Sequence, residues 1–261
     1  MAASAQKTQT SLIYRLYQWR LRKQLNQDQL PSHIAVIVDG NRRWAKQRML
    51  EHAAVGHRAG AKKIPEFLGW CAGAGVGVVT LYLLSADNLR SRKTSELEEL
   101  FQIIGELAAE ISEIPGWRIQ HVGEPELLPS QLRLALQTAE DKTRGNTGLH
   151  VNLAVGYGGR SEITAAVHKI VENHKQRGGT IDDLAEVLTP ELIGEHLWTG
   201  GQPDPDLVIR TSGEQRLSDF MIWQSAHSEF YFVEALYPDL REVDLLRALR
   251  DYSRRSRRYG A

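Results

Sequence analysis

Six short apolar runs recur along the chain and alternate with longer stretches of helical periodicity. The runs cover residues 34–38, 76–84, 118–122, 149–155, 207–210 and 229–233, and they are rich in Val and Ile. Most are continuously apolar, which is typical of strands buried on both faces of a parallel sheet. The pattern predicts an α/β fold, in which a central, mainly parallel six-stranded sheet is flanked by helices.

The clearest helical pattern follows the second run. Apolar residues between Leu97 and Ile111 recur on one helix face, which could belong to the core or could wall an apolar cavity. Ser95 and Glu98 have the spacing of a capping box, and they predict where this helix begins. Further helical patterns follow Gly60, Ser130, Ser161, Pro190 and Val243.

Residues 1–30 are predicted to form an N-terminal amphipathic helical segment, ahead of a single domain at residues 31–261. Within residues 11–25, apolar and basic side chains are interleaved. We favour a helix that packs on its own domain, and contact with a membrane surface is the alternative. The apolar positions are Leu12, Leu16, Trp19 and Leu25, and the basic ones are Arg15, Arg20, Arg22 and Lys23.

Composition narrows the class of protein. The 261 residues include 32 Lys and Arg and 32 Asp and Glu, so no net charge draws the chain to nucleic acid. The single cysteine, Cys71, excludes an internal disulfide framework and a cysteine-based metal cluster, and we expect it to be a small core residue on a helix. No window approaches 18 apolar residues and no signal peptide is visible, so we expect a soluble, cytoplasmic protein.

Charged and polar residues follow three of the predicted strands. In open parallel sheets, ligands bind outside the carboxyl ends of the strands. Guanidinium groups bind phosphate oxygens in pairs, so clustered arginines at these ends predict a pocket for a multiply charged phosphate ligand. The residues are Asp39, Gly40, Asn41, Arg42 and Arg43 after the first strand, Ser85, Asp87, Asn88, Arg90 and Arg92 after the second, and Arg210, Thr211, Ser212, Arg216 and Ser218 after the fifth.

Each of these features has a structural alternative. The Asp-Gly-Asn stretch could simply turn a strand into a helix, and Arg210 could pair with Asp206 or Glu214. His57 could be a packed or capping side chain. Two common sequence motifs of phosphate chemistry are absent, namely the P-loop and the paired aspartates of aspartyl-phosphate enzymes. The arginines must therefore serve another kind of phosphate chemistry.

Six motifs in order resemble the cis-prenyltransferases, over about residues 31–259. They are "HIAVIVDGNRRWA", "GHRAGA", "LYLLSADNL", "GNTGLHVNLAVGYGGR", "PDLVIRTSGEQRLSDFMIWQSAHSEFYF" and "YPD". The resemblance implies a Mg²⁺-dependent enzyme that extends an allylic diphosphate with isopentenyl diphosphate in Z geometry. It also implies a butterfly-shaped homodimer with an apolar tunnel beneath the diphosphate sites.

The resemblance also assigns roles to residues. Asp39 would handle Mg²⁺ and the allylic diphosphate, Glu229 would be the second metal-site carboxylate, and Asn88 would place or accept the proton lost on condensation. The isopentenyl diphosphate site would contain Arg210, Arg216, Leu217 and Ser218. The other substrate-binding residues would be Gly40, Asn41, Arg42, Arg43, Trp44, His57, Ser85, Ala86, Asp87, Leu89 and Arg92.

The chain departs from the family pattern after the second strand. The family pattern reads S-x-E-N-W-x-R, whereas this chain has Leu89 in place of the tryptophan and a shifted arginine. Either Arg90 or Arg92 could fill the arginine role, and we favour Arg92. An arginine usually found shortly before the "GH" is also missing, and His52 is the nearest candidate.

One position bears on product length. Leu83 stands where long-chain members of the family tend to have alanine, and the larger side chain would block a narrow tunnel. We therefore expect a short product, (2Z,6E)-farnesyl diphosphate made from geranyl diphosphate, as in the actinobacterial short-chain branch. A medium- or long-chain synthase is the alternative. A non-catalytic partner subunit is disfavoured, because Asp39, Arg43, Arg210, Arg216 and Glu229 are all present.

Overall fold

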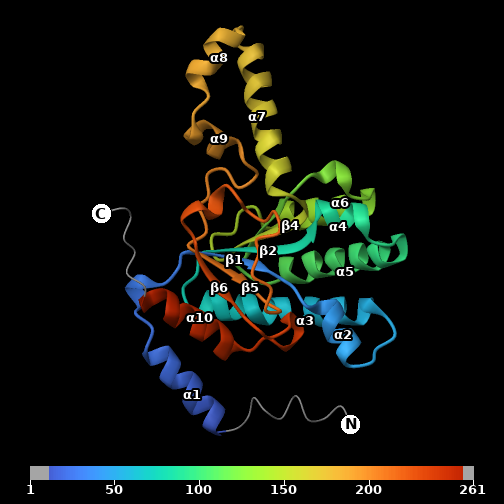
Figure 1. The fold of residues 1–261 in the computed structure, drawn as a ribbon, viewed down its shortest axis with the longest axis vertical. Helices are drawn as coiled ribbons and strands as arrows, with labels where there is room; N and C mark the ends of the chain where they lie inside the picture. Colours follow the sequence, from blue (N-terminus) through green and yellow to red (C-terminus); the bar gives the residue numbers. More distant parts are fainter. Residues whose placement is uncertain (1–11, 255–261) are drawn as a thin grey trace.

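The computed structural model describes residues 12–254, and its centre is a six-stranded sheet (Figure 1). The strand order is β3-β4-β2-β1-β5-β6, and every pairing is parallel. The prediction of a mainly parallel, six-stranded α/β fold is confirmed. The strands are β1 (His33–Ile37), β2 (Val78–Ser85), β3 (Arg118–Val122), β4 (His150–Tyr157), β5 (Leu207–Arg210) and β6 (Glu229–Phe232).

Helices flank the sheet, and Figure 1 shows α3 and α10 below the strands and α7 to α9 extending above them. Short 3-10 helices occur at Gln27–Gln29, Pro125–Leu127, Gln224–His227 and Tyr237–Asp239. The helices are α1 (Leu12–Lys23), α2 (Asn41–Gln47), α3 (Ala53–Gly73), α4 (Ala86–Ser91), α5 (Thr94–Ser112), α6 (Ser130–Thr143), α7 (Gly159–Gln176), α8 (Ile181–Val187), α9 (Pro190–His196) and α10 (Glu242–Arg254).

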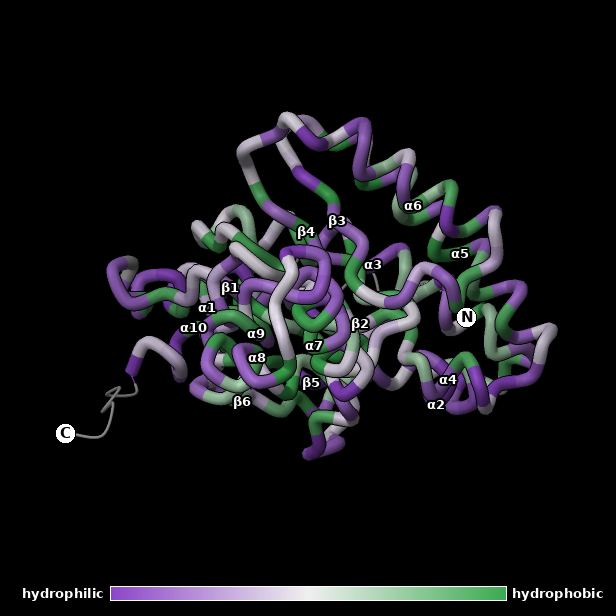
Figure 2. Tube along the Cα trace, turned by 90° about the horizontal axis from the view of Figure 1, so that it is seen from above, coloured by the Kyte–Doolittle hydropathy of each residue, from purple (hydrophilic) through white to green (hydrophobic). Residues whose placement is uncertain are grey.

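The main core lies between one face of the sheet and helices α3, α5, α6 and α10. Alternate strand residues such as Ile34, Val36 and Leu81 pack there against Phe67 of α3. Cys71 is buried in this core, as expected. In Figure 2, α5 and α6 alternate between hydrophobic and hydrophilic segments, as helices do when they bury one face.

The opposite face of the sheet has two halves. Toward the carboxyl ends of the strands it carries an aromatic cluster, in which the rings of Tyr82 and Phe220 stack with centroids 4.5 Å apart. Toward the amino ends it carries the interior polar network, in which Thr80 contacts His33 Nε2 at 2.8 Å and Asn152 Nδ2 at 2.9 Å. The network consists of His33, Thr80, Gln120, His150, Asn152 and Gln202.

The N-terminal helix α1 packs on α10, but Leu12, Leu16 and Trp19, which the pattern marked as its apolar positions, are exposed. Tyr14, Tyr17, Leu21 and the following Leu25 cover Val243 and its neighbours on α10. The division of the chain at residue 30 stays a prediction. Residues 1–11 of the predicted segment and 255–261 of the predicted domain lie outside the described residues.

One helix boundary was predicted wrongly. Helix α5 begins at Thr94, its N-cap is Lys93, and no side chain caps it, so Ser95 lies inside the first turn rather than before it. Because α4 ends at Ser91, little chain separates the two helices. Glu96 contacts in this turn the neighbouring Arg92 and, from distant segments, Arg42 and His57, and a local spacing rule cannot reveal the distant contacts.

Candidate active site

The carboxyl ends of β2, β1 and β5 lie side by side, and they bring the predicted charged stretches together. Two cavities open there and share Asp39, Arg42, Arg92 and Arg216. The first has a volume of about 850 Å³ and is lined mainly by the segment from Val38 to Ala53, with His57. The second has a volume of about 590 Å³ and is lined by the ends of β1, β2 and β5.

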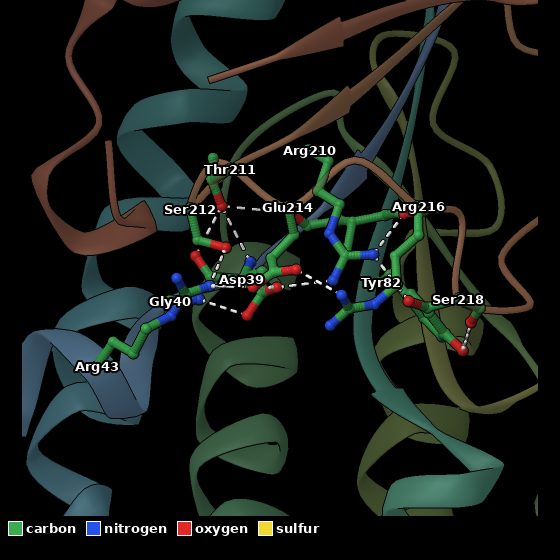
Figure 3. Close-up of polar contacts among 11 residues, drawn as sticks. Asp39, Gly40, Arg43, Tyr82, Arg210, Thr211, Ser212, Glu214, Arg216 and Ser218 are labelled. Carbon is green, nitrogen blue, oxygen red and sulfur yellow. Dashed lines mark hydrogen bonds and ion pairs between the residues drawn. The ribbon is translucent and has the colours of Figure 1, made fainter. Parts of the chain in front are cut away.

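An ion pair between Asp39 and Arg210 lies at the centre of this region (Figure 3). Arg210 is 4% exposed, and its Nη2 donates to Asp39 Oδ2 at 2.8 Å, while Asp39 Oδ1 accepts from the Gly40 N–H at 2.7 Å. Burial alone would raise the pKa of Asp39, but the Arg210 guanidinium and these hydrogen bonds lower it overall. Asp39 is therefore a carboxylate at neutral pH. The alternative pairing of Arg210 with Asp206 or Glu214 is not what the fold brings about.

Arg210 also orders the loop that follows β5. Its Nη1 donates to the Arg216 carbonyl and, at 2.7 Å, to Ser218 Oγ. Ser212 and Ser218 have positive φ angles of 78° and 52°, which are uncommon for residues other than glycine. The buried guanidinium thus holds a strained loop against the Asp39 carboxylate.

Arg43 of α2 approaches the same carboxylate from solvent. Its Nη2 donates to Ser212 Oγ at 2.6 Å, and it lies 3.4 Å from Glu214 Oε1 and 4.0 Å from Asp39 Oδ2. Its side chain is about half exposed. A ligand anion in the first cavity could therefore reach this guanidinium without displacing the buried Arg210.

Glu96 organises a second group of basic side chains, two arginines and a histidine, and sequence reasoning missed it. Its Oε1 lies 3.0 Å from Arg92 Nη1, 3.4 Å from His57 Nε2 and 3.6 Å from Arg42 Nε. Burial, followed by the nearby Arg92 charge, lowers the pKa of His57 despite the Glu96 contact. Three different helices meet at this carboxylate. Only the ion-pair geometry reveals the role, because an isolated glutamate near a helix start carries no special signal.

The structure separates the two arginines that the sequence left open. The side chain of Arg92 is 15% exposed and lines both cavities. That of Arg90 is 67% exposed and lies 3.7 Å from Asp87. The geometry favours Arg92 for contact with a ligand, in line with the preference stated from the sequence.

Helices α2 and α3 approach closely beside the first cavity. A Cβ atom on Gly56 would lie 2.0 Å from the Asn41 carbonyl oxygen, and one on Gly60 would lie 2.4 Å from Asn41 Oδ1. Gly40 has a φ of 103°, and its added Cβ would lie 2.8 Å from Leu236. These glycines let the turn after β1 pack on α3, so they explain why the two motifs occur together.

The end of β2 lines the second cavity with Leu83 and Ser85, and the start of α4 with Asp87 and Asn88. Ser85 Oγ caps α4 by accepting from the Asn88 N–H at 3.0 Å. The register between β2 and β4 shifts on both sides of Leu84, which marks a bulge at Leu83. Leu83 is partly buried and packs against the main core.

Several predicted substrate-binding residues do not line either cavity. Trp44 Nε1 donates to Asp239 Oδ1 at 2.9 Å, and Arg48 lies over its ring. Its indole is therefore used to pack α2. Ala86 is buried, Leu89 packs on the main core and Leu217 packs on the aromatic cluster. These three side chains can therefore support the residues that line the cavities, but they do not line the cavities themselves. His52, the candidate for the missing arginine, also lies outside both linings.

Glu229 is clearly separated from Asp39 along the sheet. It pairs with Leu207 at the amino end of β5, whereas Arg210 pairs with Ile37, two residues before Asp39. Leu207 and Arg210 are three residue steps apart, which amounts to about 10 Å along the strands. The two carboxylates expected to share a metal site therefore lie apart within one chain.

The Asp39 region is compatible with Mg²⁺. This ion favours oxygen ligands and usually takes one or two carboxylates together with substrate phosphates. The Asp39 carboxylate is one-third exposed and is negatively charged. No group of three or more potential metal ligands occurs among the residues that the structure describes. The chain thus offers an incomplete shell, of the kind that a diphosphate would complete.

Comparisons with known proteins agree with this geometry. Residues 37–260 match a prenyltransferase family model described as "Putative undecaprenyl diphosphate synthase". The chain is 55% identical to isoprenyl transferase 1 of Streptomyces avermitilis, over 95% of this chain and 96% of that protein. It is 49% identical to the (2Z,6E)-farnesyl diphosphate synthase of Mycolicibacterium smegmatis, over 95% of each chain.

A solved structure agrees as well. The crystal structure of lavandulyl diphosphate synthase from Lavandula x intermedia, in complex with dimethylallyl diphosphate, superposes with a TM-score of 0.82. The sequences are 34% identical, and the match covers 90% of this chain and all of the plant chain. From the motifs, the fold and these matches together, the chain belongs to the cis-prenyltransferase family.

Proposed function

We propose that this enzyme condenses isopentenyl diphosphate with geranyl diphosphate to give (2Z,6E)-farnesyl diphosphate and diphosphate. The observation that carries the proposal is the Asp39–Arg210 pair, surrounded by Arg42, Arg43 and Arg92 at the meeting point of three strand ends. The name of the M. smegmatis relative supports the proposed product.

Charge development explains why these groups are gathered there. When an allylic diphosphate ionises, negative charge accumulates on the departing diphosphate, and preorganised cations stabilise that charge. Arg43 and Arg92 can bind its oxygens, while the backbone of Gly40 and Asn41 encloses it. A bound Mg²⁺, held by Asp39 and the diphosphate, would supply further positive charge. In the second cavity, Arg216 and Ser218 would bind isopentenyl diphosphate, and Asn88 would help to place or accept the proton lost on condensation.

Leu83 supports the short product. Leu83 lines the second cavity together with Leu84 and Tyr82, and it also packs against the main core. We propose that the apolar tunnel of the family begins at this wall and that Leu83 narrows it. A leucine fills volume that an alanine would leave open for another isoprene unit.

A product assay tests the proposed chain length. The enzyme is incubated with geranyl diphosphate, labelled isopentenyl diphosphate and Mg²⁺, and the dephosphorylated products are separated by chromatography. We expect a C15 product from the wild type and longer products from Leu83→Ala. A predominant C50 or C55 product from the wild type would support the long-chain alternative, and no product at all would support a non-catalytic subunit. Chelation with EDTA should abolish turnover, and added Mg²⁺ should restore it.

We also propose a homodimer in which Glu229 serves a site formed between two copies. Its separation from Asp39 along the strands supports this arrangement. Mixing two inactive variants, Asp39→Asn and Glu229→Gln, shows whether Glu229 acts in the site of the partner copy or in that of its own chain. If Glu229 acts on the partner's site, each mixed dimer keeps one intact site, and random mixing recovers about a quarter of the activity. If Glu229 acts within its own chain, the mixture stays inactive.

The proposed location is the cytoplasm, with peripheral contact at the inner face of the cell membrane. None of the described helices is long and apolar enough to cross a bilayer. The exposed apolar residues of α1 support a contact at the surface instead.

A further inference from the structure

Helix α1 exposes an unusual amount of apolar side chain. The exposed fractions are 82% for Leu12, 79% for Ile13, 63% for Leu16 and 54% for Trp19. Leu12, Leu16 and Trp19 are four and three residues apart, so they form one stripe along the helix, here called the outer stripe. Because other residues of α1 already pack on α10, this helix is apolar on two opposite faces.

Basic side chains flank the outer stripe. Helix α1 contains Arg15, Arg20, Arg22 and Lys23 and no acidic residue. Arg22 pairs with Glu242 of α10, and the Lys23 ammonium lies 4.1 Å from the centre of the Trp19 ring. No carboxylate among the described residues pairs with Arg15 or Arg20, so their charge is available to a partner.

An exposed apolar stripe flanked by basic side chains favours one kind of partner. A second copy of the chain would bring the same positive charges together, which is unfavourable. A bilayer with anionic lipids offers apolar chains to the leucines, an interface to the indole and negative charge to the arginines. Twelve residues span about 18 Å as a helix, which suits lying in the interface rather than crossing it.

We propose that the outer stripe docks α1 on the surface of a bilayer that contains anionic phospholipids. In Figure 1, α1 lies on the side of the molecule away from α2 and α4, so the docked face does not include the cavities. This inference sharpens the peripheral contact proposed above, and it does not depend on the prenyl-transfer chemistry.

Vesicle sedimentation of the full chain tests the proposal. We expect binding to phosphatidylcholine vesicles that contain phosphatidylglycerol, and much weaker binding to phosphatidylcholine alone or at high salt. The double variant Leu16→Gln/Trp19→Gln should lower the partition coefficient by about 50-fold, because two apolar side chains no longer enter the interface. The double variant Arg15→Gln/Arg20→Gln should lower it by about 20-fold, on anionic vesicles only.

Leu134→Gln is the matched control, because Leu134 lies on α6 and is 67% exposed, close to the value for Leu16. It should bind vesicles as the wild type does. Turnover of water-soluble substrates without lipid should be unchanged in all these variants, which separates this test from the proposed function. Equal vesicle binding by wild type and Leu16→Gln/Trp19→Gln would overturn the proposal. So would wild-type chain that fails to sediment, or a change in particle mass in that variant, which would assign the stripe to a contact between copies.

Discussion

At the amino ends of the strands, His33, Thr80, Asn152 and their partners hydrogen-bond to one another as neutral groups. At the carboxyl ends of the same sheet, Asp39 and Glu96 face a group of arginines, and polar atoms remain unmatched. Asn41 Oδ1, Arg92 Nε and Arg210 Nε are buried and have no hydrogen-bond partner among the described residues. Buried polar groups in native proteins are nearly always paired, so these three exceptions beside the cavities are compatible with partners that a bound ligand would supply.

The comparison teaches how to tell a stabilising polar cluster from a functional one. The interior polar network satisfies its members internally, so its loss should weaken the fold and leave ligand affinity alone. Asp39, Glu96 and the arginines around them carry net positive charge beside the two open cavities, so their loss should weaken ligand binding or turnover more than the fold. The three predictions below test this difference, in order of decreasing effect.

The largest effect is expected for Asp39→Asn. The amide keeps the shape of the side chain but removes the charge that would hold Mg²⁺ and balance Arg210. We expect kcat to fall by about 10³-fold, which is the scale for losing a main electrostatic contact of the transition state. Steady-state kinetics with saturating substrates measures this. Circular dichroism should show an intact fold, and an active Asp39→Asn enzyme would refute the assignment of this residue.

The next effect concerns stability at the other end of the sheet. Burial lowers the pKa of His33 to about 4, from an ordinary 6.5. Because the unfolded chain binds the proton more readily, this contribution to stability is present above pH 6.5 and is lost as the pH falls toward 4. The loss amounts to about 3 kcal/mol. Urea unfolding should show that the free energy of unfolding of the wild type falls between pH 7.5 and pH 4.5. In His33→Asn this fall should be smaller.

His168→Asn is the control for this measurement, since His168 is exposed on α7. Its pH dependence should match that of the wild type. His150 also has a pKa lowered to about 4, by burial and then by the Arg118 charge, so some pH dependence should persist in His33→Asn. Equal slopes in wild type and His33→Asn would contradict the prediction.

The smallest effect separates two neighbouring arginines. Arg92→Gln should raise KM for the allylic diphosphate by about tenfold, because one charge-assisted hydrogen bond to phosphate is lost. Arg90→Gln should leave KM within twofold of the wild type, as the side chain points to solvent and pairs with Asp87. Initial-rate measurements with both variants decide the matter, and the reverse ranking would show that the cavity assignment of Arg92 is wrong.

Much of the fold could be predicted from the sequence, because continuous apolar runs report burial on both faces. All six strands were found, within a few residues of their ends. The carboxyl-end rule then placed Asp39, Arg210 and Arg92 in one region without any structure. These successes share a cause, since strand burial and strand direction follow from short, local patterns.

The remaining features depend on contacts between distant segments. Glu96 is marked by its contacts with Arg42 and His57, which come from distant segments, and Trp44 is turned away from the cavities by Asp239. The separation of Glu229 from Asp39 follows from the register of β5 and β6. Neither register nor the choice of an ion-pair partner is written in the local sequence, so these could only be found from the fold.

The bulge at Leu83 has a consequence for how such an enzyme can change over evolutionary time. In a regular strand, resizing a side chain strains the neighbours on both sides, because each residue is fixed by the ladder. At a bulge, one residue is left outside the ladder, so a larger or smaller side chain there need not shift the hydrogen bonds between the strands. If Leu83 sets the product length as proposed, a single substitution there would reset the length of the hydrocarbon while the strand pairing of the sheet is kept.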